Sequence, residues 1–191
     1  MQFSLFGAAA AAPTLDDLDG VLLAGGHWVR SGAGARLSVV VADRWRADAL
    51  AEAFAERDVA ADDAVGPAEA GLTVRTAFAS HLVPRAARWV QGAVQLPPAG
   101  FQLTSGGLRL WAIAVGRADE VGYLLGTAEV DDQIHRAAGA QLARLGIAAV
   151  SIGLRGGPGW RVTSIKRLRR LIELVGEPPP GGAPDWPRFS H

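Results

Sequence analysis

The sequence has 191 residues, of which 49% are apolar, 20% charged and 7% aromatic, a composition typical of a folded domain rather than a disordered or fibrous chain. Nineteen basic side chains balance nineteen acidic ones, so any binding to nucleic acid or to an anionic membrane must come from local patches. The absence of cysteine excludes disulfides, thiolate zinc sites and cysteine nucleophiles. No apolar run is long enough to cross a membrane and no basic secretory start is present, so we expect a cytoplasmic protein.

The first half of the chain predicts alternating helices and strands behind an irregular start. Residues 1–13 have no helical or strand period, and their alanine run indicates a flexible tether. Thr14 is a helix-capping residue followed by acidic residues, which predicts a helix over 14–24. The remaining elements expected in this half are strands over 27–30 and 35–42, a helix over 45–57, a strand over 71–78 and a helix over 80–91.

The same order recurs in the second half, which indicates an internal duplication. Residues 18–29 align without a gap with residues 99–110, at an offset of 81 positions. The elements expected after them are a hairpin of 108–116 with 121–128, a helix over 130–146, a hairpin of 148–154 with 159–165, and a helix over 166–176. The alternative is a chance likeness between two stretches of helices and strands.

These boundaries predict an α+β fold made of two copies of helix, hairpin, helix, hairpin, helix, although the residues before 71 show only a weak strand pattern. The expected organisation is a tether over 1–13, a first repeat over 14–98, a second repeat of the same domain over 99–177, and a disordered proline-rich tail over 178–191.

The first residues carry a short peptide pattern made of Gln2, Ser4, Leu5 and Phe6. This pattern resembles the bacterial sliding-clamp-binding pentapeptide, which reads Gln, any residue, Ser or Asp, Leu, Phe. An amide that hydrogen-bonds at one subsite and two apolar side chains that fill a pocket suit recognition of an extended peptide. The resemblance implies the sliding clamp, the beta subunit of DNA polymerase III, as a partner. The alternative is that these apolar residues, with Phe3, fold back on the domain.

Residues 18–26, which read LDGVLLAGG, resemble a degraded LAGLIDADG motif, and the two-copy order of elements is the architecture of that family. The resemblance covers about residues 15–176 and is fainter in the second copy, at 101–107. It implies two motif helices packed side by side at a pseudo-twofold axis, which small residues such as Gly20 and Ala24 permit. It also implies that the strands of both copies form a saddle over a DNA groove.

Homing endonucleases of this family carry a metal-binding acidic residue near the end of each motif helix, and the positions that match here are Gly25 and Gly106. Without paired carboxylates nothing holds a divalent metal at the scissile phosphates, so we expect no catalytic residue, no metal, no cofactor and no cleavage. The LAGG spelling is closer to WhiA-type transcription regulators, which have a LAGLIDADG-like domain without nuclease function. The alternative is an ordinary α+β domain in which LAGG only ends a helix.

Arginine and tryptophan recur at alternate positions of the expected strands, which places them on single strand faces suited to phosphate contact and stacking. The charge is also uneven, because residues 1–95 carry a net charge of −3 and residues 96–191 a net charge of +3. The candidate DNA-binding residues are Trp28, Arg30, Arg36, Arg75, Arg109, Trp111, Arg161 and Lys166. The alternative is that these arginines are solvated or paired with acids.

The sequence thus favours a non-enzymatic, monomeric, nucleoid-associated protein that binds DNA through a degenerate LAGLIDADG-like sheet and the sliding clamp through its first residues, in replication, repair or their regulation. Three alternatives stay open: a free-standing WhiA-like transcription regulator, a Mg²⁺-dependent nuclease that uses atypical acids, and an adaptor that binds the clamp alone.

Overall fold

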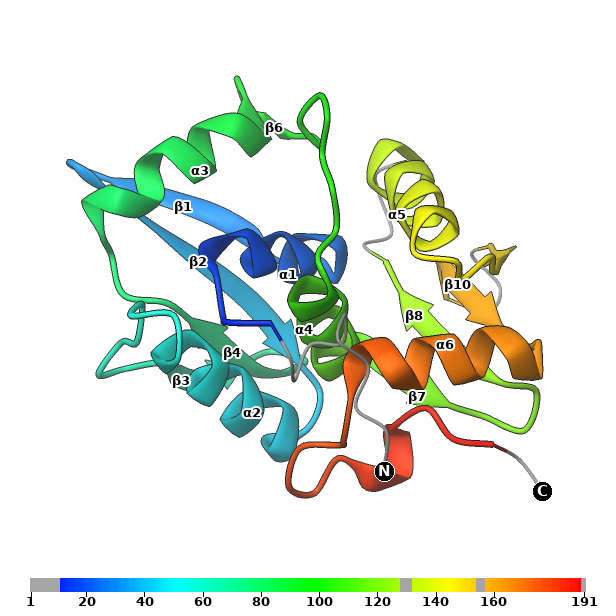
Figure 1. The fold of residues 1–191 in the computed structure, drawn as a ribbon. Coiled ribbons are helices and arrows are strands. Elements are labelled where there is room, and N and C mark those ends of the chain that lie inside the picture. The colour runs from blue at the N-terminus through cyan, green and yellow to red at the C-terminus, as the bar shows by residue number, and fades with distance from the viewer. Residues whose placement is uncertain (1–10, 128–131, 154–156, 190–191) are drawn as a thin grey trace.

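The computed structural model describes residues 11–127, 132–153 and 157–189 (Figure 1). Its helices are α1 (Asp19–Leu23), α2 (Arg44–Ala55), α3 (Val83–Trp89), α4 (Ser105–Val115), α5 (Asp132–Arg144) and α6 (Ile165–Val175), with short 3-10 turns at Leu15–Leu18, Ser80–Leu82 and Ala183–Asp185. Its strands are β1 (His27–Ser31), β2 (Gly34–Val41), β3 (Val65–Ala68), β4 (Gly71–Arg75), β5 (Val90–Gln91), β6 (Val94–Gln95), β7 (Gly116–Ala118), β8 (Tyr123–Gly126), β9 (Val150–Ile152) and β10 (Gly159–Val162).

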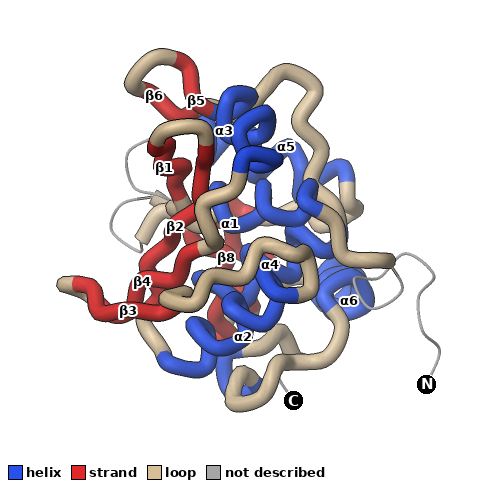
Figure 2. The backbone as a smooth tube through the Cα atoms, turned by 90° about the vertical axis from the view of Figure 1, so that its left-hand side faces the viewer, coloured by secondary structure: helices blue, strands red, loops and turns tan. Residues whose placement is uncertain are grey.

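The strands form two antiparallel four-stranded sheets with the same internal order. The first sheet has the order β1-β2-β4-β3 and the second the order β7-β8-β10-β9, while β5 and β6 make a separate small hairpin. Figure 1 shows the two sheets on either side of the central helices α1 and α4. In the view of Figure 2, the strands of the first sheet lie along the left side of the molecule and most of the helices lie to their right. The expected two-copy α+β architecture is confirmed.

The core lies between the helices and one face of each sheet. Its largest fully buried side chains include Trp89, Trp111, Tyr123 and Phe54. The central helix α4 has eight buried residues out of eleven, and its first turn is capped by the hydroxyl of Thr104, which accepts a hydrogen bond from the backbone N–H of Gly107 at 2.8 Å. Within the described part of the chain, no helix is both long and apolar enough to cross a membrane.

The two copies are related by an offset that differs from the one read from the sequence. At the contact between the central helices, Gly20 meets Gly107, and Asp17 accepts a hydrogen bond from Thr104; both pairs are 87 positions apart. Residues that meet each other at a twofold axis are each other's counterparts, so they fix the offset. In the sheets the offset is 86, since Ser38 pairs with Arg75 across β2 and β4 as Leu124 pairs with Arg161 across β8 and β10. The ungapped alignment at 81 positions is therefore wrong, although the duplication of the fold is real.

One predicted strand is a helix. Residues 108–116 alternate apolar and polar side chains at their start, which favoured a strand, but the structure places them in α4 and the first residue of β7. Because α4 is surrounded by other elements, it needs no polar face, and an apolar run without a helical period cannot be told from a strand by pattern alone. The first hairpin of the second copy is β7 with β8 instead.

The strand of the first copy with only a weak sequence pattern is β3, which contains a glycine and a proline within four residues. Both residues are poor strand formers, and proline cannot donate to a ladder, so such a strand is tolerated at the edge of a sheet. Its place is consistent with this rule, because β3 pairs only with β4 at the end of the first sheet.

The proline-rich tail is packed against the domain rather than disordered over its described part, residues 177–189. The indole of Trp186 is 4% exposed and donates a hydrogen bond to the carbonyl of Gly176 at 2.7 Å. The carboxylate of Asp185 pairs with Arg46 at 3.2 Å. The composition of the tail predicted disorder, but one buried aromatic side chain and one ion pair tie it to the fold.

Candidate nucleic-acid interface

Each sheet has one face toward the helices and one outer face. On β2 the side chains of Ala35, Leu37, Val39 and Val41 are buried, so they face the helices, and the residues between them point outward. Residues that pair directly across antiparallel strands share a face. The pairing register therefore assigns the side of every strand residue in the sheet.

The outer face of the first sheet carries a polar row across three strands. His27 of β1 pairs with Ser38 of β2, which in turn pairs with Arg75 of β4. The guanidinium of Arg75 lies 3.3 Å from the carboxylate of Asp63, whose side chain is 72% exposed. Thr73 lies two residues before Arg75 on the same face. Polar and charged side chains thus gather on the face of this sheet that does not pack against the helices.

Arg36 lies on the same outer face, next to this row along β2. Its guanidinium carbon sits 4.5 Å from the centre of the Phe78 ring, within the range of a cation–π contact. The ring of Phe78 is 44% exposed. The structure therefore brings together two of the three predicted arginines of this sheet, Arg36 and Arg75, on its outer face.

The outer face of the second sheet carries two arginines around an apolar residue. Leu124 of β8 pairs with Arg117 of β7 on one side and with Arg161 of β10 on the other. Arg161 donates to Asp119 at 2.7 Å. The other carboxylate oxygen of Asp119 accepts the backbone N–H groups of Val121 and Gly122, both at 2.9 Å, so the turn between β7 and β8 fixes this acid.

The predicted arginines on the outer faces share a further property. The Nε atoms of Arg36, Arg75 and Arg161 are buried, and no hydrogen-bond acceptor reaches them among the described residues. The side chains of Arg75 and Arg161 are also partly exposed, at 23% and 25%. Buried donors are nearly always satisfied in folded proteins, so three such atoms on one kind of surface need an explanation.

Two predicted residues of β1 point toward the helices instead. Trp28 pairs with Leu37 and Arg30 pairs with Ala35, so both side chains share the core-facing side of the first sheet. Trp28 is 8% exposed, whereas Arg30, one residue before the end of the strand, is exposed. Strand alternation correctly placed Trp28 and Arg30 on one face, but the sequence could not say which face.

Arg109 and Trp111 belong to α4 and not to a strand, so neither lies on an outer face. Arg109 donates to the carbonyls of Val175 and Glu177 at 2.5 and 2.6 Å, and burial lowers the pKa of its guanidinium. Trp111 is fully buried, and its indole donates to the carbonyl of Gly126 at 2.6 Å. Both side chains tie the second copy together.

Lys166 is exposed in the first turn of α6, which packs against α4. It therefore does not lie on a sheet face. The structure does not group it with the outer-face arginines. His27 and Arg117, in contrast, lie on the outer faces and were not among the predicted residues. The pairing of their strands would have identified them, because their own sequence context shows no alternation.

The two motif positions that hold acids in homing endonucleases lie in different surroundings from those expected. Gly25 follows α1 with a φ of 95°. Gly106 lies in the first turn of α4, where a Cβ would be 2.5 Å from the carboxylate of Asp17, so it is not at the end of a helix. At the structural offset of 87 positions, the counterpart of Gly25 is the buried Ala112. Neither position carries a carboxylate.

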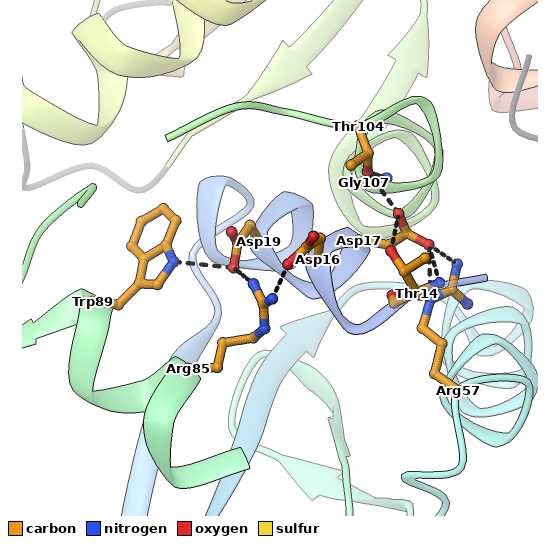
Figure 3. A network of polar contacts seen from close by, with 9 residues as sticks. All are labelled: Thr14, Asp16, Asp17, Asp19, Arg57, Arg85, Trp89, Thr104 and Gly107. Carbon is orange, nitrogen blue, oxygen red and sulfur yellow. Dashed lines mark hydrogen bonds and ion pairs between the residues drawn. The ribbon is translucent and has the colours of Figure 1, made fainter. Parts of the chain in front are cut away.

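The acids nearest to the central helices are engaged in internal contacts (Figure 3). Asp17 accepts hydrogen bonds from Thr104 at 2.6 Å and from Arg57 at 2.7 Å. Asp19 accepts hydrogen bonds from Arg85 at 2.9 Å and from the Trp89 indole at 3.0 Å, while its burial raises the pKa of its carboxyl group. No group of three potential metal ligands lies together in the part of the chain that the structure describes.

The clamp-peptide residues Gln2, Ser4, Leu5 and Phe6 lie outside the described residues. The described chain begins at residues 11–13, which line a cavity of about 360 Å³ together with Asp17, Glu56, Arg57, Gly106, Arg109 and Glu177. These side chains come from the central helices, from α2 and from the tail, so the chain emerges on the helical side of the molecule and not on an outer sheet face.

The fold is shared with solved LAGLIDADG structures. Full-length DUF199/WhiA from Thermatoga maritima matches with a TM-score of 0.58 and 12% identity, over 84% of this chain and 54% of that one. The homing endonuclease I-WcaI, solved bound to its DNA recognition sequence, matches with a TM-score of 0.60 and 10% identity, over 84% of this chain and 79% of that one. The N-terminal LAGLIDADG domain of DUF199/WhiA matches with a TM-score of 0.56 and 15% identity, over 85% of this chain and 80% of that one.

The chain spans about half the length of full-length WhiA, at 54% of that chain. No protein-family profile and no curated protein sequence matches it. The sequence identities of 10–15% carry no residue roles across, but the backbone matches these structures over 84–85% of the chain. The chain therefore has the LAGLIDADG fold.

Proposed function

We propose that the protein binds duplex DNA with the outer faces of its two sheets and does not cleave it. The observation that carries this proposal is the pair of arginine-bearing rows, one at the centre of each outer face, which hold Arg75 and Arg161 at corresponding places. Guanidinium groups suit phosphate oxygens, because they donate several hydrogen bonds in one plane.

The neutral net charge does not oppose this function, because Arg36, Arg75, Arg117 and Arg161 lie on the outer faces and provide local positive charge there. Phosphate contacts provide most of the affinity for DNA and make that affinity depend on salt. The I-WcaI structure, which contains its DNA recognition sequence, supports the same use of the fold. The role that follows is a DNA-associated one in replication, repair or transcriptional regulation.

Replacing Arg75 and Arg161 by glutamine is the direct test. The double variant should bind a mixed-sequence duplex at least tenfold more weakly at about 50 mM salt, and the slope of log affinity against log salt should fall by about 2, because two phosphate contacts are lost. Fluorescence anisotropy with a labelled duplex measures both quantities.

The matched control removes the same charge from the helical side, with Arg44→Gln and Arg167→Gln. Arg44 is 74% exposed on α2, and Arg167 is exposed on α6. This variant should bind DNA almost as the unchanged protein does. Equal losses in the two double variants would show that DNA responds to net charge alone and would overturn the assignment of the outer faces.

Absence of cleavage follows from the chemistry of the motif ends. Gly25 and Ala112 offer no oxygen ligand from a side chain, and the nearby Asp17 and Asp19 are occupied by Arg57 and Arg85. A divalent metal would have no paired carboxylates to hold it at a phosphodiester. Plasmid and linear duplex incubated with Mg²⁺ or Mn²⁺ should stay intact; metal-dependent nicking would instead favour a nuclease with atypical acids.

We further propose that the first residues bind the sliding clamp through Gln2, Ser4, Leu5 and Phe6. A clamp encircles DNA, so a peptide joined to a DNA-binding domain by residues 7–13 would convert a weak DNA contact into an intramolecular one at high effective concentration. The variant with Leu5→Ala and Phe6→Ala should lose clamp binding, because these side chains fill the apolar pocket.

Calorimetry with the purified clamp, in the absence of DNA, measures this effect. The unchanged protein should bind with micromolar or better affinity and the variant should give no heat of binding. The thermal unfolding of the two proteins serves as the control for folding. Equal clamp affinity would contradict the peptide assignment and favour a free-standing DNA-binding regulator.

A further inference from the structure

The charges of α6 are arranged against the dipole of their own helix. Lys166, Arg167 and Arg169 are exposed in its first half, and its first turn holds no acid. The start of a helix carries partial positive charge, so cations are unfavourable there. None of the three makes a hydrogen bond or an ion pair with another residue that the structure describes. The start of α6 is therefore a concentrated positive surface that the described chain leaves without a partner.

A groove near the other end of α6 has an excess of acids. It consists of two adjoining cavities of about 360 and 290 Å³ between α2, α4 and the tail. Apart from the ion pair of Asp17 with Arg57, its charged lining residues are Glu52, Glu56, Arg109 and Glu177. The carboxylates of Glu52 and Glu177 make no hydrogen bond or ion pair with any residue in the described ranges. This acidic groove therefore attracts cations.

An apolar side chain accompanies the cations of α6. Ile165, the first residue of the helix, is the most exposed of the large apolar side chains that the structure describes, at 67%. The acidic groove has an apolar wall that includes Ala49, Ala53, Ile113 and Pro178–Pro180. An isoleucine followed directly by two cations thus matches an apolar wall edged with glutamates in both hydrophobicity and charge.

The two surfaces are placed so that one copy of the chain fits a second copy. Helices α2 and α6 both pack against α4, and Figure 2 shows α6 on the side away from the strands of the first sheet. With 11 residues, α6 is about 16 Å long, and Glu177 follows its last residue by two positions. When two copies of α6 lie antiparallel across a twofold axis, the start of each helix lies beside the end of the other. The cations then face Glu177 and the negative end of the second dipole, which offsets the conflict with their own helix.

We propose that two copies of the chain form this dimer through their helical sides, in place of the monomer expected from the sequence. Ile165 of each copy fills the acidic groove of the other, so the same contact is made twice. The paired surfaces belong to helices and the tail, which leaves the outer sheet faces free on opposite sides of the dimer. On the basis of the DNA-binding function proposed above, one dimer holds two duplexes at once.

Sedimentation velocity of the full chain without DNA tests the dimer. At about 50 mM salt the unchanged protein should sediment with twice the mass of one 19.9 kDa chain, and it should dissociate as added salt screens the ion pairs. Lys166→Glu with Arg167→Glu, or Glu52→Lys with Glu177→Lys, should each weaken the dimer about a hundredfold, because like charges then meet. A monomeric unchanged protein, or variants that dimerise as well as it does, would overturn the proposal.

An equal mixture of these two charge variants controls for folding. In the mixture, the acidic helix of one variant meets the basic groove of the other, and the basic helix of the second meets the acidic groove of the first. A heterodimer should therefore form, and a mixture that stays monomeric would contradict the contact. The Leu5→Ala, Phe6→Ala variant should dimerise as the unchanged protein does; loss of its dimer would assign the contact to the first residues and overturn the proposal.

A duplex fixed on beads tests the consequence for DNA. The unchanged protein should retain a second, labelled duplex on these beads, whereas either charge variant alone should not. Equal retention by the charge variants would contradict bridging by the dimer. A dimer that binds no duplex at low salt would instead overturn the proposed DNA-binding function and leave the dimer itself supported.

Discussion

Replacing Gly20 by alanine should destabilise the protein by about 3 kcal/mol or more, above the usual range for overpacking. A Cβ at this position would lie 1.8 Å from the carbonyl oxygen of Gly107 and 2.4 Å from its carbonyl carbon. Both atoms belong to the backbone, so no side chain can rotate away to make room. The two central helices would have to separate, and the core packed around them would open.

Denaturant unfolding followed by circular dichroism measures this loss. The matched control is Gly153→Ala, because a Cβ there meets nothing within 4 Å. The control should unfold within about 0.5 kcal/mol of the unchanged protein, as exposed substitutions generally do. Similar stabilities for the two variants would mean that the central helices do not pack as closely as the contact between Gly20 and Gly107 requires.

Replacing Arg46 by methionine should cost about 3–5 kcal/mol, the range measured when one partner of a buried ionic network is removed. Its guanidinium donates to the carbonyls of Ile113 and Gly116, each at 2.8 Å, and pairs with Asp43 at 3.0 Å and with Asp185 at 3.2 Å. The side chain is only 7% exposed. Methionine keeps much of the volume but leaves two buried carbonyls without this donor.

The same unfolding measurement applies, with Arg44→Met as the control. Arg44 stands on the same helix and pairs with Asp48, but its side chain is 74% exposed, so its loss should cost less than about 1 kcal/mol. Because Arg46 also holds Asp185, the first variant should loosen the tail, and protease should cut the tail sooner. An Arg46 variant as stable as the Arg44 variant would contradict the bridging role of this residue.

Much of the fold was predictable because most helices and strands of each copy are indicated by local sequence signals. Capping at Thr14, the glycine-rich turn before β2 and the periodic helices required no knowledge of distant contacts. The exceptions have a common cause. Helix α4 is enclosed by other elements, and Trp186 is held by a carbonyl ten positions away, so both depend on tertiary packing that pattern reading does not see.

The candidate interface was predictable only in part, because the side of a strand depends on its pairing. Arg36, Arg75 and Arg161 lie on the outer faces as expected, but the alternation that joined Trp28 to Arg30 is equally consistent with either side. A shift of one residue in register reverses the face of every side chain in a strand. The position of His27 on the outer face follows only from its pairing with Ser38.

The covalent link between the copies has an evolutionary consequence. In a symmetric homodimer, one gene encodes both halves, so each substitution is imposed twice and the halves stay identical. Here one chain carries both, and each half can drift alone. Ser38 and Leu124, at corresponding places of the two sheets, already differ.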